Sequence, residues 1–294
     1  MEVVGTPRVI VCRECGHDFS LELSVCPHCY RPCAHYPNVT AAQDPGERQA
    51  LQRRHAAARD KAQAAGVASV FDGFEEAVGQ TSVAVVARPM DIAVLLMKST
   101  EELWPTYHQM RAAGLRRADP DYGVPRTGSE EALFPGYKEQ IHSAALSLDG
   151  IGAKSYGECS ISLREAFIAH RASVFEENNV LWTLRRKGSR DPRKLPKGRR
   201  AQWGERGVLA ATKLADQLAP STTAAEFAGL LLQQGATTDD DSFVEVHIYG
   251  SLTVRAVEKV TLTTGAKTRR QDQVRIRALT EALREVGASL ETSP

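Results

Sequence analysis

Four cysteines near the N-terminus constrain this chain more than any other feature. They form two Cys-x-x-Cys pairs, Cys12 with Cys15 and Cys26 with Cys29, and ten residues separate the pairs. Two residues between thiolates allow one tight turn to aim both sulfurs at a single metal ion, and two such turns supply the four ligands of a closed tetrahedral Zn²⁺ site. Gly16 suits the left-handed conformation that follows such a turn. The spacing therefore predicts a structural zinc site made of these four cysteines.

The two cysteine turns resemble those of the zinc-ribbon family, and the resemblance covers about the first tenth of the chain. It implies a small domain over residues 1–36 that docks on nucleic acid or on a protein partner. About thirty residues bury too little apolar surface to offset the entropy of ordering them, so we expect metal binding and folding of this segment to be one event. A redox dithiol pair and a disulfide framework are the competing interpretations. Cys33 and His35 follow closely and are open candidates for a replaced or additional ligand.

The composition is that of an ordinary soluble globular protein. The 294 residues are 42% hydrophobic and 25% charged, with a net charge of +1. The balanced charge excludes a general electrostatic attraction to nucleic acid or to membranes. Five of the six cysteines lie in the first 33 residues, which suits a reducing compartment. The N-terminus lacks a charged segment followed by a long apolar core, and no apolar run approaches about twenty residues, so we expect a cytoplasmic protein without a membrane span.

Beyond residue 36 the pattern predicts two further regions. Residues 37–65 are expected to be a helical linker, with a connector over 37–45 and then an alanine-rich helix that serves as an exposed strut. Residues 66–294 are expected to form an α+β body with a mixed or antiparallel sheet flanked by helices. Strands are predicted at 82–87, 159–163, 171–175 and 242–249, helices at 67–78, 90–98, 101–113, 205–218, 222–234 and 271–286, and a loop at 119–129.

The clearest strand, residues 242–249, carries the first candidate site. With the two-residue period of a strand, Glu245 and His247 share one face, and Val244, Val246 and Ile248 share the other. A carboxylate beside an imidazole, facing away from the apolar core, can form the edge of a catalytic cleft. The alternative interpretation is an ordinary solvated face.

A second candidate lies between residues 156 and 179, where polar side chains are unusually dense. Tyr156, Arg171 and Ser173 are accompanied there by the run Glu176 to Asn179. These side chains can bind hydroxyls, amides or phosphates. Helix capping and turn chemistry are the alternative explanation, since Asn and Ser commonly end secondary-structure elements.

Together these segments resemble the ADP-ribosyltransferase-type bacterial toxins and related uncharacterised bacterial proteins. The resemblance lies in a Tyr-Gly pair at residues 156–157, an Arg-Ala-Ser-Val-Phe-Glu-Glu-Asn run at 171–178 and a late Glu-x-His-Ile-x-Gly strand at 245–250. The matching stretch runs from about Lys138 to Val260. The chain departs from the usual family pattern at three positions, namely Ser173 in place of Thr, His247 in place of Gln and Tyr249 in place of His.

The resemblance implies a split, mostly antiparallel sheet with NAD in its cleft and cleavage of the bond between nicotinamide and ribose. Glu245 would hold the ribose 2′-hydroxyl and stabilise the positive charge that develops at the neighbouring carbon, with His247 beside it in the catalytic pair. Arg171 would bind the pyrophosphate, Ser173 would support the ribose or the carboxylate, and Tyr156 would stack on the nicotinamide. The implied activity is that of an ADP-ribosyltransferase or NAD glycohydrolase.

A non-enzymatic adaptor is the competing hypothesis, in which the ribbon and a basic loop over residues 185–200 bind nucleic acid or a protein target. A solvated linker is the alternative interpretation of this loop, because like charges keep a loop open. Its basic residues are Arg185, Arg186, Lys187, Arg190, Arg193, Lys194, Lys197, Arg199 and Arg200. Other enzyme classes lack their sequence signatures, since the chain has no GxxxxGK[ST] phosphate loop, no HExxH helix and no GxSxG elbow.

Overall fold

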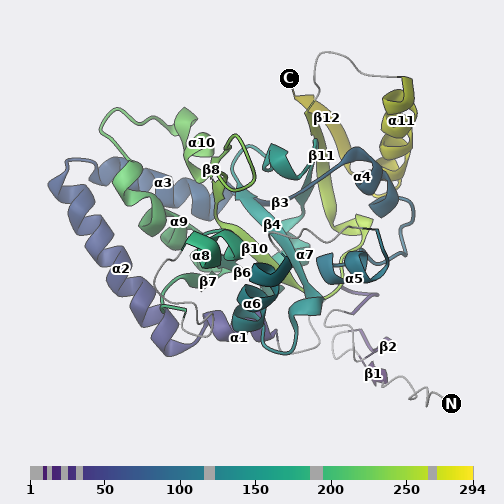
Figure 1. The fold of residues 1–294 in the computed structure, drawn as a ribbon, viewed down its shortest axis with the longest axis horizontal. Coiled ribbons are helices and arrows are strands. Elements are labelled where there is room, and N and C mark those ends of the chain that lie inside the picture. The colour runs from purple at the N-terminus through teal and green to yellow at the C-terminus, as the bar shows by residue number, and fades with distance from the viewer. Residues whose placement is uncertain are drawn as a thin grey trace.

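The computed structural model of the chain describes residues 9–11, 15–20, 26–30, 36–115, 123–185, 195–263 and 270–293. It confirms the predicted α+β class: a mixed eight-stranded sheet forms the centre of the molecule and helices surround it (Figure 1). The order across the sheet is β12-β11-β5-β3-β4-β10-β6-β7, and all neighbours are antiparallel except β11 and β12.

The strands of this sheet are β3 (Val83–Arg88), β4 (Ile141–Ser147), β5 (Cys159–Leu163), β6 (Ala172–Phe175), β7 (Arg200–Gln202), β10 (Glu245–Tyr249), β11 (Val257–Thr263) and β12 (Ser289–Ser293). Two small hairpins are formed by β1 (Val9–Val11) with β2 (Asp18–Ser20) and by β8 (Leu232–Gln233) with β9 (Ser242–Phe243).

The α-helices of the described residues are α1 (Pro37–Ala42), α2 (Pro45–Ala64), α3 (Ala68–Thr81), α4 (Met90–Leu96), α5 (Tyr107–Ala112), α6 (Gly123–Leu133), α7 (Glu165–Ile168), α8 (Asn179–Arg185), α9 (Arg206–Leu214), α10 (Phe227–Leu231) and α11 (Arg270–Glu285). None of the described helices is both long enough and apolar enough to cross a membrane.

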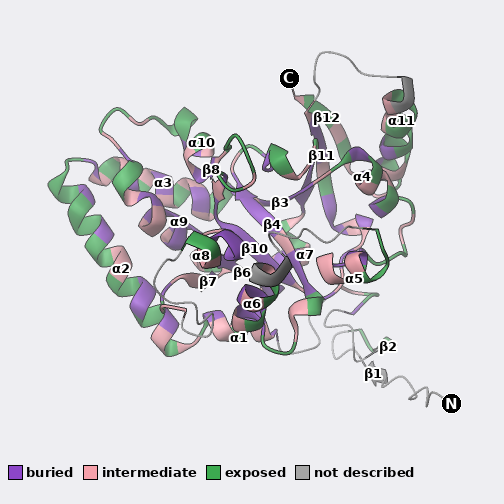
Figure 2. Ribbon diagram, in the orientation of Figure 1, coloured by how far each residue is buried: buried purple, intermediate pink, exposed green. Residues whose placement is uncertain are grey.

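The two faces of the central strands are chemically different because side chains alternate along each strand. On β10, Val246 and Ile248 belong to the main apolar core, which α3, α9, α4 and α11 also line. Glu245 and His247 face the opposite side, where residues of α6 and α8 form a second, smaller apolar cluster with the sheet. The central strands are buried on both faces (Figure 2). The predicted alternation on this strand is therefore confirmed, but its polar face is covered rather than solvated.

The sheet is split between β3 and β4. The two strands pair only from Val83 with Ser147 to Val85 with Ala145. Beyond that point β3 continues to Arg88 paired with β5, and β4 continues toward Ile141 paired with β10. The two halves of the sheet therefore diverge in the middle of the molecule.

Several predicted elements need correction. The connector over 37–45 contains α1, the loop over 119–129 includes the start of α6, and the helix over 101–113 begins only at Tyr107. The helix predicted at 222–234 shortens to α10, because Leu232 pairs with Phe243 and continues the chain as a strand. A short leucine-rich run has no period that separates a helix from a buried strand.

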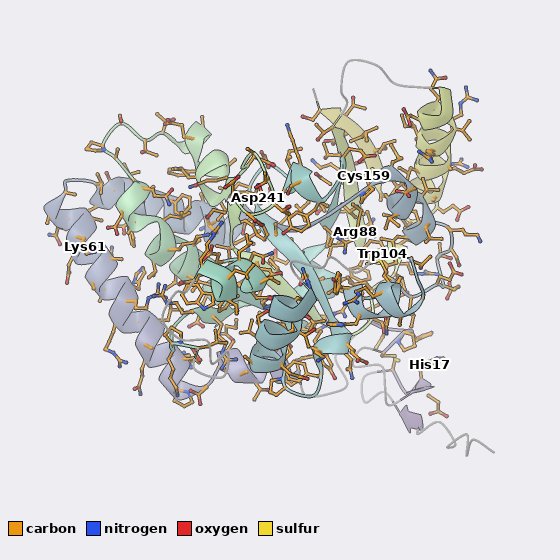
Figure 3. The ribbon with its side chains drawn as sticks, in the orientation of Figure 1. His17, Lys61, Arg88, Trp104, Cys159 and Asp241 are labelled. Atoms are coloured by element: carbon orange, nitrogen blue, oxygen red, sulfur yellow. The ribbon has the colours of Figure 1, made fainter. Side chains whose placement is uncertain are left out.

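The alanine-rich helix α2 packs on the body instead of standing free in solvent. Leu51, Ala58 and Ala62 are buried in the main core, while Lys61 points outward (Figure 3). The carboxylate of Asp44 caps the helix by accepting the backbone N–H of Gly46 at 2.9 Å. The expected exposed strut is thus wrong: small alanine side chains let this helix approach α3 and α9 closely.

Candidate functional site

A cavity of about 70 Å³ lies in the split of the sheet. Val85, Ala87 and Arg88 line it from β3, and Ser143 and Ala145 line it from β4. The side chain of Glu245 also lines it. A larger cavity of about 530 Å³ adjoins it. The residues that line both cavities are Arg88, Tyr107, Arg126, Tyr156 and Asn178. The split therefore gives access from a wide outer space to a buried carboxylate.

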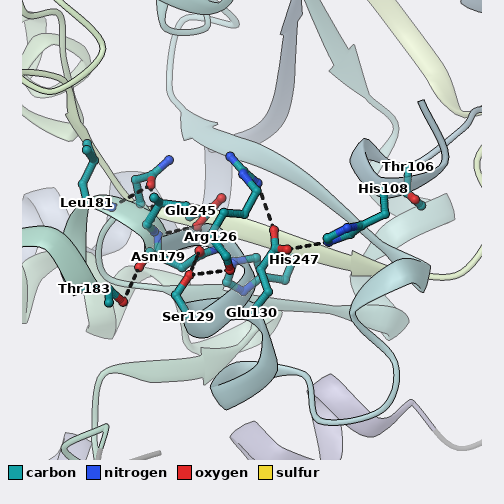
Figure 4. A network of polar contacts seen from close by, with 12 residues as sticks. Thr106, His108, Arg126, Ser129, Glu130, Asn179, Leu181, Thr183, Glu245 and His247 are labelled. Atoms are coloured by element: carbon teal, nitrogen blue, oxygen red, sulfur yellow. Dashed lines mark hydrogen bonds and ion pairs between the residues drawn. The ribbon is translucent and has the colours of Figure 1, made fainter. Parts of the chain in front are cut away.

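Glu245 is the acidic centre of this cavity. Its residue is only 2% exposed, and its Oε2 atom accepts the backbone N–H of Asn179 at 2.8 Å (Figure 4). Burial alone would raise the pKa of this carboxyl. The neighbouring His247, the Asn179 amide and the guanidinium of Arg126 outweigh burial and hold the pKa of Glu245 below its usual range. The carboxylate is therefore ionised at neutral pH.

His247 stands behind Glu245 and does not line the cavity. Its Nε2 lies 3.1 Å from Oε2 of Glu245, which is ion-pair distance, although the N–H direction is not aligned for a hydrogen bond. The ring packs edge-on against Phe134, with 4.7 Å between centroids, and lies nearly parallel to Phe175. This aromatic enclosure fixes the imidazole beside the carboxylate.

The polar run before α8 serves both the helix and the cavity. Asn178 Oδ1 accepts the N–H groups of Val180 and Leu181 at 3.0 and 3.1 Å, which is the pattern of a helix N-cap. The other end of the same amide, Nδ2, donates to the hydroxyl of Tyr156 at 3.2 Å. The capping interpretation is thus correct for Asn178, and the same side chain positions Tyr156 at the cavity.

Gly157, which follows Tyr156, occupies a position where only a glycine fits. Its φ is 142°, and a Cβ atom at this position would lie 2.0 Å from the carbonyl carbon of Arg88. Only a residue without a side chain lets the turn at 154–157 close against the end of β3. The Tyr-Gly pair therefore brings the tyrosine ring to the split edge of the sheet.

Arg126, on α6, brings a positive charge close to Glu245. Its Nη1 donates to Oε1 of Glu130 at 2.9 Å, and its guanidinium lies 4.2 Å from the ring centroid of Tyr107. His108 holds the other carboxylate oxygen of Glu130 at 2.6 Å. Burial lowers the pKa of Arg126, but Glu130 and Glu245 raise it overall. In Figure 4, Arg126, Glu130 and His108 are connected to Glu245 through Ser129 and Asn179.

Arg171 and Ser173 do not line the Glu245 cavity. The guanidinium of Arg171 donates to the carbonyls of Phe167, Tyr249 and Ser251 at 2.9, 2.7 and 2.8 Å, at the far end of β10. Burial lowers its pKa to about 10. Ser173 lies opposite His247 across β6 and β10, and its Oγ accepts from Asn38 at 3.2 Å. Of the predicted residues, Glu245 and Tyr156 share the cavity and His247 touches Glu245.

Three of the four predicted metal ligands come together near the N-terminus. The sulfurs of Cys15, Cys26 and Cys29 lie within 4.8 Å of one another, and those of Cys15 and Cys26 are 3.6 Å apart. Four sulfurs at 2.3 Å from a zinc ion would be about 3.8 Å apart in a tetrahedron, so this spacing suits a metal and is too long for a disulfide bond. Cys12, Cys33 and His35 lie outside the described residues.

The second cysteine turn has the local features of a metal-binding knuckle. The N–H of His28 points to the Sγ of Cys26 at 3.4 Å, and the N–H of Tyr30 closes the turn on the Cys26 carbonyl at 2.9 Å. Gly16 has φ of 73°, as expected for the residue that follows the first turn. The three cysteines could hold a metal ion.

The described part of the basic loop is neutralised within the protein. Lys197 pairs with Asp44 at 3.2 Å and Arg200 pairs with Glu47 at 3.1 Å. Two further ion pairs join Arg185 to Glu177 and Arg199 to Glu176. The other five basic residues, within 186–194, lie outside the described residues. The four described charges are therefore engaged by the body.

The sequence matches no protein-family model and no curated protein. The resemblance to ADP-ribosyltransferases thus rests on short sequence motifs alone.

Proposed function

We propose that this protein is an NAD-dependent enzyme of the ADP-ribosyltransferase type that also carries a structural zinc site. The observation that carries the proposal is the ionised Glu245 inside the split of the sheet, reached through a cavity lined by two arginines and two tyrosines. The outer cavity of about 530 Å³ falls within the usual range for small-molecule sites.

Glu245 would accept a hydrogen bond from a ribose hydroxyl and stabilise positive charge at the adjacent carbon as nicotinamide departs. A carboxylate suits this role only if it is ionised before the substrate binds. His247, Asn179 and Arg126 provide that condition, because each favours the charged form. The cavity is small enough to exclude most water around the reacting bond, which strengthens the interaction.

Arg126 and Arg88 would take the role of phosphate binding that we first expected of Arg171. Both residues line the inner and the outer cavity, so they would contact a pyrophosphate that lies between the two spaces. Tyr156 and Tyr107 line the same two spaces and offer flat surfaces for a nicotinamide or adenine ring. Ser173 would act only indirectly, by holding β6 against β10 beside His247.

The metal would be Zn²⁺, bound by Cys12, Cys15, Cys26 and Cys29. The all-sulfur set, the two-residue spacing and the 3.6 Å separation of Cys15 and Cys26 sulfurs support zinc over a hard cation. A closed set of four protein ligands has no open position for substrate, so this ion would stabilise the turns rather than act on NAD.

Release of nicotinamide from NAD by the full-length protein tests the catalytic proposal. We expect Glu245→Gln to reduce the rate by at least about 100-fold, because the isosteric amide cannot stabilise positive charge. Glu258→Gln is the matched control, since this residue is exposed on β11, and it should retain the wild-type rate. Equal rates for wild type and Glu245→Gln, with intact folds, would reject the proposal.

The alternative function is a zinc-ribbon adaptor that binds nucleic acid or a protein. Its support is the exposure of the cysteine turns, where residues 15–18 and 27–28 face solvent and the rings of His17 and His28 stack at 5.0 Å. Gel retardation of RNA or DNA at low salt that disappears at high salt, together with no cleavage of NAD, would favour this alternative.

A further inference from the structure

We infer that Arg171 couples the cysteine centre to the strand that carries Glu245, as the counter-charge of a metal–thiolate centre. The inference rests on the zinc site proposed above and does not depend on NAD chemistry. It assigns a role to the buried guanidinium of Arg171, which does not line the Glu245 cavity.

The second cysteine turn is packed directly on the body. The ring of Tyr30 contacts that of Phe167, with 5.1 Å between centroids. Cys26 and Pro27 line a small cavity of about 90 Å³ together with Arg171, Ser251 and Glu101. The proposed metal ligand Cys26 and Arg171 thus line one cavity at the foot of β10.

Arg171 has no carboxylate partner among the described residues. It is 2% exposed, and its guanidinium donates three hydrogen bonds, all to backbone carbonyls. A buried cation is costly unless a negative charge compensates it. The lowered pKa of Arg171, caused by burial, is consistent with this missing compensation.

A zinc ion bound by four thiolates supplies the missing charge. The cysteines bind as thiolates, so the centre carries four negative charges against two positive ones. Cys26 is fully buried and lines the same cavity as Arg171. The guanidinium would stabilise the loaded centre, and the loaded centre would in turn favour the buried guanidinium.

The same guanidinium fixes the end of β10. Its Nη1 binds the carbonyls of Tyr249 and Ser251, which flank Gly250 in the turn after the strand. Glu245 lies at the other end of this strand and His247 in its middle. Metal loading would therefore hold the turn at 249–251, and through it the register of the strand that carries the carboxylate.

Arg255 offers a matched control. It lines the same cavity, but its side chain is 43% exposed and its guanidinium already pairs with Glu101 at 2.7 Å. A general effect of positive charge near the cysteines would appear in both arginine variants. A specific role for the buried charge would appear only at Arg171.

The first experiment measures zinc release from the full-length protein to a chromogenic chelator. We expect Arg171→Gln to release zinc at least about tenfold faster than wild type, as loss of a residue supporting metal ligands typically does. Arg171→Lys, which keeps the charge but not the three-carbonyl geometry, should fall between the two. Arg255→Gln should match wild type. Equal release from wild type and Arg171→Gln would overturn the inference.

A second experiment uses only the wild-type protein, because a buried arginine variant can fail to fold. Hydrogen exchange is compared with zinc bound and after chelation. We expect the amides of residues 247–252 to lose protection on chelation, while those of α9, over 206–214, stay unchanged. Unchanged exchange at 247–252 would overturn the inference and leave the NAD proposal intact. A full-length protein that binds no zinc at all would overturn the zinc proposal and this inference together.

Discussion

Glu245 and Arg171 are both buried charges at opposite ends of β10, yet their surroundings differ. Glu245 lines the cavity in the split and is surrounded by charged groups from α6 and its own strand and by a backbone amide of α8. Arg171 lines a separate cavity beside Cys26, but among the described residues its guanidinium donates only to backbone carbonyls. The comparison teaches that burial alone does not mark a catalytic group. A carboxylate in a cavity that adjoins a space of about 530 Å³ can act on a ligand, whereas a guanidinium that donates to three backbone carbonyls holds the backbone.

The largest effect on stability should come from Arg171. Arg171→Met removes three hydrogen bonds and leaves the carbonyls of Phe167, Tyr249 and Ser251 without this donor. We expect the free energy of unfolding to fall by about 3 kcal/mol, measured by urea denaturation. Glu245→Gln keeps the shape of the side chain and should cost less than about half of that. A larger loss of stability for Glu245→Gln than for Arg171→Met would contradict the difference drawn between the two buried charges.

Ligand binding should respond to Arg126 next. Arg126→Gln removes the charge that faces both cavities but leaves Glu130 with its contact to His108. We expect NAD affinity, measured by calorimetry, to fall by at least about tenfold, as for loss of a charge-assisted hydrogen bond. Arg59→Gln, on the exposed face of α2, is the control. An unchanged affinity for Arg126→Gln would remove the phosphate site from the account.

The acid stability of the protein should depend on His142, a buried base at the split edge of β4. Burial, with nearby Arg171 and Arg88, lowers the pKa of His142 to about 3 from 6.5. Below pH 6.5 the unfolded chain binds a proton that the folded protein does not, so stability falls as the pH drops from 6.5 toward 3. The slope from this group is at most about 1.4 kcal/mol per pH unit. The free energy of unfolding of His142→Asn, measured by urea denaturation at several pH values, should depend less steeply on pH over this range. The same pH dependence as in wild type would contradict the assignment.

Glu245 behaves in the opposite sense. Its pKa is depressed, so the stability it contributes is present above the pKa of an unfolded glutamate, near 4.5, and is lost as the pH falls through the lower folded value. Above pH 5, nicotinamide release should therefore not report the titration of this carboxyl. A pH profile with an acid limb near 6 that disappears in Glu245→Gln would show that the carboxyl is protonated in that range.

The smallest effect should come from the exposed pair of Lys197 and Asp44. Both side chains are about half exposed, at 60% and 46%. Such surface pairs are screened by water and salt. We expect no measurable change in the midpoint of thermal unfolding for Lys197→Gln. A clear loss would indicate that the basic loop contributes to the fold more than its exposure suggests.

The sequence predicted features that arise from neighbouring residues, but it did not predict contacts between distant segments. The cysteine spacing predicted a cluster that is confirmed for Cys15, Cys26 and Cys29, while Cys12 lies outside the described residues. Strand alternation correctly placed Glu245 and His247 on one face. Arg126 was missed because it follows a segment rich in Pro and Gly that predicts a loop, whereas α6 begins at Gly123. No periodic signal connects it with Glu245, more than a hundred residues later.

Arg171 shows why adjacency in sequence misleads. The predicted strand over 171–175 includes Arg171, and the resemblance implied that Arg171 and Ser173 bind NAD in one site. The strand begins only at Ala172, and Arg171 closes a 3-10 turn over 169–171. The change of backbone conformation at that residue sends its side chain to the end of β10. An error of one residue in the predicted start of this strand therefore changes which groups surround the Arg171 guanidinium.

The central claim is that the divergence of β3 and β4 is the nucleotide site. Crystals of the full-length protein soaked with NAD test it most directly. The account predicts density in the split, with a ribose hydroxyl beside the Glu245 carboxylate and phosphate oxygens beside Arg126 or Arg88. Density at the Arg171 cavity instead, or an empty split at saturating NAD, would contradict it.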